Sequence, residues 1–207
     1  MLTGIFGWDF GYNMGNLKTA FLTWNLYLDY KAGMKIYANY PLKFPYTQLK
    51  GFGSILEILK NENNIAIGID ELHTYMDCYS PPSKKSGGWQ FKELARQTRK
   101  NTVKLYVDAQ SYADVHKSIR RVLFKVWLTR KLDMHYQPCY DDYCHQPHII
   151  EVFDVKTNKT VYYPMPLEIF DLYDTSAVVE WEENIDLRQT AYDKKHNCKP
   201  KREKYIT

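Results

Sequence analysis

The sequence predicts a three-layer α/β domain, in which a mostly parallel β-sheet carries helices on both faces. Short apolar runs alternate with helix-like stretches over residues 1 to 131, as crossover connections between parallel strands require. The uncharged run 65–69 ends in two adjacent carboxylates, Asp70 and Glu71. A run near the N-terminus is followed by a glycine-containing turn and a helix-like segment. Because parallel sheets bind ligands beyond the carboxyl ends of their strands, a ligand site is expected at that edge.

The expected strands are rich in β-branched and aromatic residues, which favour strands over helices. They lie at 2–6, 34–39, 65–70, 103–109 and 123–129. The stretches between them have helix-like apolar periodicity. These helices are expected at 19–31, 53–61, 89–99 and 112–121. Each predicted helix therefore connects two predicted strands, which gives a sheet with helical crossovers.

A small appendage is expected after the sheet domain. The run IIEVFDVKTNKTVYYP predicts a β-hairpin, because two alternating apolar segments flank the turn KTNKT. A short helix near 167–172 and the strand-like run AVVEW follow. The charged, poorly periodic C-terminal segment is expected to be a basic, disordered or peripheral tail. The expected division is a core at 1–132, an appendage at 133–183 and the tail at 184–207.

Composition excludes several classes of protein. The 207 residues, 44% hydrophobic and 25% charged, fit one globular domain of ordinary size. No apolar run approaches the roughly 20 residues that span a bilayer, and no signal pattern is present, so no membrane contact is expected. Four sparse cysteines fit reduced thiols in a cytoplasmic setting. The net charge of +4 permits nucleic-acid contact without arguing for it.

Residues 11 to 19, GYNMGNLKT, have the order of a phosphate loop: a strand, a glycine turn, then Lys-Thr at a helix N-terminus. In such loops the backbone N–H groups face the phosphates, a lysine neutralises phosphate oxygens and a threonine hydroxyl ligates Mg²⁺. Lys18 and Thr19 would fill the last two roles. The expected nucleotide-binding residues are Asn13, Met14, Gly15, Asn16, Leu17, Lys18 and Thr19.

This loop departs from the pattern G-x-x-x-x-G-K-[ST], whose glycines would fall at Tyr12 and Leu17. A side chain at position 17 can crowd the approach of the backbone to phosphate. Two interpretations are therefore open, a working phosphate loop and a glycine-containing turn that precedes Lys-Thr by chance. The acidic strand at the expected distance favours the first.

The acidic pair is predicted to serve a metal ion and a water molecule. Asp70 would hold Mg²⁺ together with Thr19, and Glu71 would polarise the attacking water. The alternative is a pair of solvated carboxylates at a strand end. That alternative fits poorly with the uncharged run before them, because burying a charge without a partner is costly.

Basic side chains precede the run VKLYVDA, and Gln110 follows it. An arginine such as Arg96 or Arg99 can stabilise the charge on a transferring phosphoryl group, often from a neighbouring subunit. Gln110 can orient the γ-phosphate or the attacking water. The alternative for the arginines is a solvated helix face.

The chain resembles the FtsK–HerA superfamily of P-loop ATPases in the order of its motifs. These are, from the N-terminus, GYNMGNLKT, KIYANYPLK, IAIGIDELH, RQTRK, VKLYVDAQ and DVHKSIR. The resemblance covers residues 2 to about 131, with a weaker likeness at FDLYDT. It is nearest to the small DNA-packaging ATPases of archaeal and related viruses and to Zot-like phage assembly proteins. Zot-like proteins often carry a membrane segment, and this sequence shows none, which favours the packaging branch.

The resemblance implies a RecA-like sheet, with Arg99 as an arginine finger and Gln110 as a polar sensor. It implies ATP and Mg²⁺ as cofactors, and ATP hydrolysis that moves double-stranded DNA through a homo-oligomeric ring with shared active sites. Capsid or portal proteins are further expected partners, and the host cytoplasm or the virion is the expected location. Tyr12 and Leu17 keep an alternative open, a degenerate nucleotide-binding or virion-assembly scaffold protein without hydrolysis.

Two further predictions concern loops and the tail. The KSGGW loop and the basic segment from Lys194 to Lys204 are the expected DNA contacts. A possible zinc ligand set, in a C-x4-C spacing looser than that of established zinc sites, comprises Cys139, Cys144, His145 and His148. The alternative is a polar loop that contains ordinary thiols.

Overall fold

The computed structural model describes most of the sheet domain and the hairpin that follows it. The described residues are 1–8, 17–75, 102–113, 115, 117–139, 144 and 146–174. The predicted helix at 89–99, the run AVVEW, the KSGGW loop and the basic tail lie outside these ranges.

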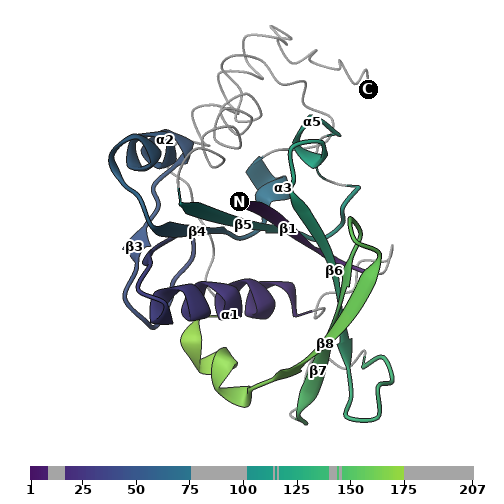
Figure 1. The fold of residues 1–207 in the computed structure, drawn as a ribbon. Coiled ribbons are helices and arrows are strands. Elements are labelled where there is room, and N and C mark those ends of the chain that lie inside the picture. Colours follow the sequence, from purple (N-terminus) through teal and green to yellow (C-terminus); the bar gives the residue numbers. More distant parts are fainter. Residues whose placement is uncertain are drawn as a thin grey trace, which may run out of the picture.

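A mixed sheet of eight strands lies at the centre of the described structure, in the order β3-β2-β4-β5-β1-β6-β7-β8 (Figure 1). Neighbouring strands from β3 through β6 are parallel, and β7 and β8 are antiparallel. The strands are β1 (Leu2–Gly7), β2 (Lys35–Ala38), β3 (Thr47–Gln48), β4 (Ile65–Ile69), β5 (Val103–Ala109), β6 (Lys125–Leu132), β7 (His148–Asp154) and β8 (Lys159–Met165). Strand β5 thus separates β1 from β4.

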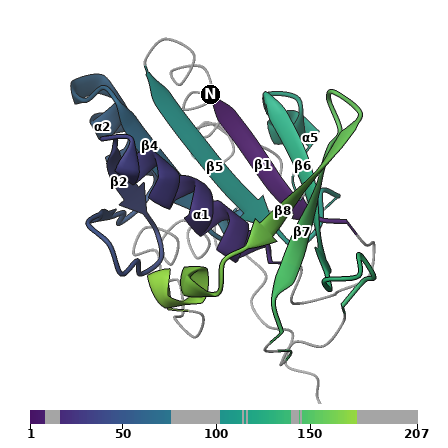
Figure 2. The same cartoon turned by 60° about the horizontal axis from the view of Figure 1, so that its bottom comes forward.

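Helices cover both faces of the sheet, as Figures 1 and 2 show. The α-helices are α1 (Lys18–Lys31), α2 (Phe52–Asn61), α3 (Leu72–Tyr75) and α5 (Lys117–Arg120), and η1 (Leu167–Leu172) is a 3₁₀-helix. Helices α1 and η1 lie on one face, and α2, α3 and α5 lie on the other. None of the helices in the described ranges is long and apolar enough to cross a membrane.

Side-chain alternation along β4 divides the core into two layers. Ile65, Ile67 and Ile69 pack into the cluster beneath α2 and α5. Ala66 and Gly68 face α1, where large side chains have no room. A Cβ atom on Gly68 would lie 2.5 Å from Leu26 Cδ1 of α1. The small residues of β4 therefore let α1 lie directly against the sheet.

The same alternation places polar residues of β5 on the α1 face. The Lys104 ammonium forms an ion pair with Asp29, and the Tyr106 hydroxyl donates a hydrogen bond to the same carboxylate at 2.9 Å. Two positions further along β5, Asp108 meets Thr19 at the other end of α1. Polar contacts thus fix α1 to β5 near both of its ends.

The expected hairpin is present and extends the main sheet. Strand β7 pairs with β6 from the Leu132–Ile149 pair onward, and β8 forms the outer edge. The chain then returns through η1, which places Ile169 in the core cluster beneath α1. A backbone hydrogen bond from Lys43 N–H to the Leu172 carbonyl (2.8 Å) attaches the end of η1 to the segment after β2.

The predicted strands match β1, β2, β4, β5 and β6 to within a few residues at each end. The predicted helix at 112–121 is wrong in extent, because only α5 is helical there among the described residues. The Ser111 hydroxyl accepts a hydrogen bond from the Ala113 N–H (3.1 Å), which stabilises a turn in place of a first helical turn. The short elements β3 and α3 were not expected.

Candidate nucleotide and metal site

The segment Leu17 to Thr19 lies at the N-terminus of α1. Leu17 adopts the left-handed conformation (φ 54°, ψ 25°), and its carbonyl accepts the hydrogen bond from the Phe21 N–H at 2.8 Å. Glycine takes this conformation without strain, and position 17 is where the phosphate-loop pattern has glycine. The half-buried Leu17 side chain packs against the core cluster beneath α1. Residue 17 is therefore a leucine with the backbone conformation that the glycine of the pattern would adopt.

The Thr19 hydroxyl is the meeting point of three elements. Its Oγ1 lies 3.1 Å from Asp70 Oδ1, at the end of β4, and 3.2 Å from Asp108 Oδ2 on β5. One hydroxyl has one proton, so it donates to only one of the two carboxylates at a time. Hydroxyl and carboxylate oxygens gathered in this way are the donors that Mg²⁺ prefers.

Asp108 is fully buried, and burial is the main cause that raises its pKa well above the ordinary value. The charge of Asp70 and a hydrogen bond to it raise the pKa further. The backbone N–H of Glu71, which donates to Asp108 Oδ1 at 2.8 Å, and the charge of Lys18 act in the opposite direction. Two adjacent carboxylates repel each other when both are ionised, and a cation bound between them would stabilise the ionised pair.

The side-chain amide of Asn39, at the end of β2, is hydrogen-bonded to both the backbone N–H and the backbone carbonyl of Asp70. The Asp70 N–H donates to Asn39 Oδ1 (2.8 Å), and Asn39 Nδ2 donates to the Asp70 carbonyl (3.0 Å). The Asn39 side chain is buried, and the backbone carbonyl of Asn39 accepts a hydrogen bond from Gln48 Nε2 (3.2 Å). This pairing fixes the carboxylate of Asp70 relative to Thr19, as partners of metal ligands commonly do.

Glu71 follows Asp70 at the carboxyl edge of the sheet. Its backbone has a positive φ of 54° while its N–H donates to Asp108. Non-glycine residues with positive φ are uncommon, and they cluster at functional sites. Leu17, two residues before Thr19, and Glu71, directly after Asp70, both have this conformation.

Gln110 lies directly beyond β5, beside the end of β1. Its carbonyl accepts a hydrogen bond from the Gly7 N–H at 3.2 Å. Trp8 follows, with its N–H donating to the Thr129 carbonyl (3.0 Å) and its ring 4.9 Å from that of Phe153. The chain that enters the predicted phosphate loop is therefore held between β5 and β6. The loop residues Asn13, Met14, Gly15 and Asn16, and also Arg96 and Arg99, lie outside the described residues.

Two buried tyrosines lie near the carboxylates. Tyr40 exchanges a hydrogen bond with the Thr23 hydroxyl (2.9 Å), and Tyr173 lies after η1. Burial is the largest cause that raises the pKa of both tyrosines, and the charges of Asp70 and Asp108 raise it further. Both phenols therefore stay neutral, and the C-terminal part of the described chain contributes to the surroundings of the site.

Sequence reasoning found Lys18, Thr19, Asp70 and Glu71 but missed Asp108 and Asn39. The signal for Asp108 was present, because VKLYVDA places an acid inside an apolar strand, which is the argument applied to Asp70. Asn39 ends the predicted strand MKIYAN, yet an asparagine at a strand end is common in turns. No sequence pattern distinguished its role.

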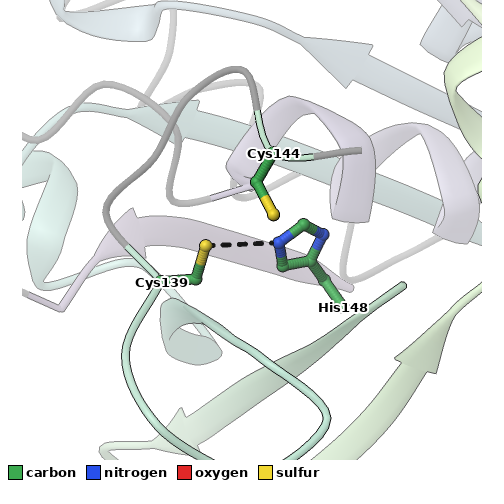
Figure 3. A group of neighbouring side chains, drawn as sticks. All are labelled: Cys139, Cys144 and His148. Carbon is green, nitrogen blue, oxygen red and sulfur yellow. Dashed lines mark hydrogen bonds between the residues drawn. The ribbon is translucent and has the colours of Figure 1, made fainter. Parts of the chain in front are cut away.

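A second group of chemically reactive side chains lies in the connection between β6 and β7. The ligand atoms of Cys139, Cys144 and His148 all lie within 4.8 Å of one another (Figure 3). His145, the fourth residue of the predicted set, lies outside the described residues.

The sequence matches no protein-family model and no curated protein. Solved structures do match. The N-terminal domain of zonular occludens toxin from Neisseria meningitidis has a TM-score of 0.54 at 14% identity, covering 84% of this chain and 98% of that one. The genome packaging NTPase B204 from Sulfolobus turreted icosahedral virus 2, in complex with ATP-gammaS, has a TM-score of 0.52 at 8% identity, covering 80% and 97%. Flagellar accessory protein FlaH from Methanocaldococcus jannaschii has a TM-score of 0.50 at 10% identity, covering 80% and 85%.

At such low identity these likenesses concern the fold. They extend over at least four fifths of this chain and nearly the whole of the first two proteins. The predicted three-layer α/β class is confirmed, and so is the resemblance to Zot-like and viral packaging ATPases as a likeness of fold. The chain has the RecA-like fold of P-loop ATPases.

Proposed function

We propose that this protein binds ATP with Mg²⁺ and hydrolyses it. The observation that carries the proposal is the Thr19 hydroxyl, which lies 3.1 Å from Asp70 and 3.2 Å from Asp108 at the N-terminus of a 14-residue helix. A helix N-terminus attracts phosphate, and the carboxylates attract a cation. Both features lie at the carboxyl edge of a parallel sheet, where such folds bind ligands.

The phosphates would lie against the first turn of α1. No described side chain caps this N-terminus, so its first N–H groups are available to an anion. Lys18 would neutralise phosphate oxygens, and Asn13 through Leu17 would surround them. Thr19 and Asp70 would hold Mg²⁺, and the structure adds Asp108 to these two residues. When bound, Mg²⁺ would neutralise charge on the β- and γ-phosphates.

Glu71 would polarise the attacking water, and Gln110 would orient the γ-phosphate or the water. The hydrogen bond from the Gly7 N–H to the Gln110 carbonyl supports this assignment, because Gly7 ends the strand that leads into the predicted phosphate loop. Arg99 would come from a neighbouring protomer.

The test is a magnesium-dependent ATPase assay, run with and without duplex DNA. Lys18→Ala and Glu71→Gln should each abolish turnover, with Glu71→Gln retaining ATP binding. Lys60→Ala and Glu57→Gln are matched controls on the exposed face of α2, and should hydrolyse ATP at the natural rate. Absence of turnover in the natural protein under every condition would contradict the enzymatic proposal.

The second candidate is a nucleotide-binding or virion-assembly scaffold protein without hydrolysis. Leu17 and Tyr12, at the two glycine positions of the pattern, favour it. Calorimetry with ATP separates the candidates, since binding without turnover supports the scaffold protein. Retention of Asp70, Asp108 and Glu71 around Thr19 favours the enzyme.

We further propose that the ATPase moves or packages double-stranded DNA as a homo-oligomeric ring, with residues 1–132 as its catalytic core. The likeness to a viral genome packaging NTPase supports this. The KSGGW loop and the basic tail would contact DNA, and residues 133–183 would form an appendage to the core. Capsid or portal proteins would be further partners, in the host cytoplasm or the virion. Because lysine–phosphate contacts release counterions, DNA affinity should fall steeply with salt. A salt-independent interaction would contradict the DNA assignment.

A further inference from the structure

We propose that Cys139, Cys144 and His148 bind a zinc ion in the connection between β6 and β7. Their sulfur and ring-nitrogen atoms all lie within 4.8 Å of one another, and His148 Nε2 is 3.3 Å from Cys139 Sγ (Figure 3). Thiolate sulfur and imidazole nitrogen are the donors that zinc prefers in proteins. The nucleotide site uses none of these residues, so this would be a separate metal site.

The first ligand, Cys139, is held by the backbone of β6. Its N–H donates to the Lys131 carbonyl at 3.0 Å, and its neighbour Pro138 bridges to Leu132. The intervening turn is closed by Asp133, whose carboxylate accepts hydrogen bonds from two backbone N–H groups of the turn, at 2.8 and 2.9 Å. Cys139 is therefore positioned by the sheet and its turn before any metal binds.

The second ligand, His148, is held by the neighbouring strand. It is the first residue of β7, is buried, and pairs with Met165 of β8. The next residue, Ile149, pairs with Leu132 at the end of β6. Cys139 is thus hydrogen-bonded to β6, and His148 begins the strand that pairs with β6, so the backbone holds the two ligands at a fixed separation.

These separations suit a tetrahedral zinc ion. Zinc–sulfur and zinc–nitrogen bonds of about 2.3 and 2.1 Å imply a sulfur–nitrogen distance of about 3.6 Å and a sulfur–sulfur distance of about 3.8 Å. The 3.3 Å between Cys139 and His148 is close to the first value. The upper limit of 4.8 Å for the group requires a shift of Cys144 by no more than about 1 Å. A rotation of this half-buried side chain achieves that.

Zinc completes its coordination with a fourth donor. Asp141, Asp142 and His145 flank Cys144 in the sequence and lie outside the described residues. A water molecule would complete the coordination of the three described ligands. The three described ligands already close the segment from 139 to 148, so a bound zinc would fasten this connection to the end of β6.

This connection flanks the nucleotide site. Strand β6 runs parallel to β1, and the Thr129 carbonyl accepts the hydrogen bond from Trp8 just before the predicted phosphate loop. Cys139 attaches to the same strand two residues further on, at Lys131. Zinc binding should therefore stabilise strands β6 and β7 beside the predicted loop, and this effect is independent of ATP hydrolysis.

The experiment uses the full chain, purified with a reductant, stripped with a chelator and titrated with Zn²⁺ or Co²⁺. We expect about one Zn²⁺ per chain and a rise of roughly 5–10 °C in the thermal midpoint at saturating metal. The Co²⁺ complex should show a thiolate charge-transfer band and the intense visible bands of tetrahedral coordination. Adding Zn²⁺ should displace the Co²⁺ and remove both signals.

Substitutions assign the ligands. Cys139→Ser, Cys144→Ser and His148→Gln should each weaken zinc binding at least ~100-fold, because even partners of metal ligands contribute 10–100-fold. Cys78→Ser and Cys198→Ser change the two remaining cysteines of the sequence and should leave the affinity unchanged. Cys144→Ser changes a side chain that is half-exposed and lies outside the strands, so it tests the proposal even if the buried His148→Gln variant fails to fold.

Three results would overturn the proposal. The first is a folded, reduced natural chain that shows no Co²⁺ bands. The second is an equal loss of zinc binding in the cluster variants and the control variants. Mass spectrometry that finds a Cys139–Cys144 disulfide in metal-free protein, with no zinc uptake after reduction, would likewise assign these thiols to another role.

Discussion

Asp108 shows how a single buried carboxyl group can lower the stability of a folded protein. Its carboxyl group is buried beside Asp70, and its folded-state pKa lies well above the ordinary value. For a carboxyl group with a raised folded-state pKa, the free energy of unfolding is higher at low pH. It falls as the pH rises from the unfolded-state pKa toward the folded-state pKa. Asp108 therefore costs stability at neutral pH until a cation binds.

We predict that Asp108→Asn stabilises the nucleotide-free protein by roughly 1–3 kcal/mol at neutral pH. The asparagine oxygen can still accept the Glu71 N–H, and no buried charge remains. The gain should shrink as the pH falls below ~3, where the aspartic acid is neutral in both states. Denaturant unfolding at the two pH values measures this.

The same variant should lose the magnesium dependence of ATP binding in calorimetry, because a ligand charge is gone. Equal stability at both pH values together with unchanged magnesium dependence would show that Asp108 is not coupled to the site. Asp171→Asn, on an exposed residue of η1 away from this site, is the control and should change neither property.

Leu17 yields a second prediction at the residue scale. A non-glycine residue in the left-handed conformation costs about 1–2 kcal/mol, and burying part of a leucine side chain returns a similar amount. Leu17→Gly should therefore change the free energy of unfolding by less than ~1 kcal/mol and retain ATP binding. Leu17→Val should cost about 1–2 kcal/mol more, because β-branched residues tolerate positive φ poorly.

Thermal unfolding and ATP titration of the two variants check this prediction. If valine were tolerated as well as glycine, residue 17 would not adopt the left-handed conformation in solution, and the likeness to a phosphate-loop glycine would fail.

At the scale of elements, the contact between α1 and β4 positions the Thr19 hydroxyl. A Cβ on Gly68 would lie 2.5 Å from Leu26 Cδ1 and 3.0 Å from Leu22 Cδ2, and both leucines are fully buried. We predict that Gly68→Ala destabilises the protein by about 1–3 kcal/mol through overpacking. It should also raise KM for ATP, because α1 must shift away from the strand that ends in Asp70.

Gly33→Ala supplies the matched control for this prediction. Gly33 follows the other end of α1, has φ +83° and has no atom within 4 Å of an added Cβ. Its substitution costs about 1 kcal/mol through backbone strain without displacing α1. KM for ATP should therefore stay unchanged. Equal changes of KM in the two variants would show that general destabilisation, and not helix position, controls the site.

At the scale of the whole molecule, the prediction concerns a shared active site. If Arg99 reaches a neighbour's nucleotide, Arg99→Ala and Glu71→Gln should each be inactive alone and regain some ATPase activity when mixed. The reason is that some interfaces then carry both intact halves, and a heterologous contact of this kind can close into a ring. Steady-state ATPase rates over a range of mixing ratios measure the effect.

Gel filtration with light scattering supplies the control, since each variant must still assemble. A mixture that stays inactive although both variants assemble and bind ATP would contradict the shared site. Full activity of the natural protein as a dilute monomer would do so as well.

The sequence by itself determined where the central strands of the sheet lie and which residues the candidate site takes from β4 and the start of α1. Strands buried on both faces are mostly apolar, so β1 and β4 were readable from composition. Strand β5 was readable from its β-branched and aromatic residues, although it also contains Lys104 and Asp108. Asp70 and Glu71 stood out because charge directly after such a run is unfavourable without a role. Lys18 and Thr19 stood out because their order after a glycine turn is a local pattern.

Only the tertiary structure decided which polar side chains meet. Thr19 and Asp108 lie 89 positions apart, and Asn39 and Asp70 lie 31 apart. The first contact depends on β5 lying between β1 and β4, and the second depends on the pairing of β2 with β4. Strand order is set by how whole layers pack, not by any local pattern. Cys139 and His148 were grouped from the sequence as possible zinc ligands, in a loose spacing. The pairing of β6 with β7 supplies what the spacing left open, a separation of 3.3 Å between the two side chains.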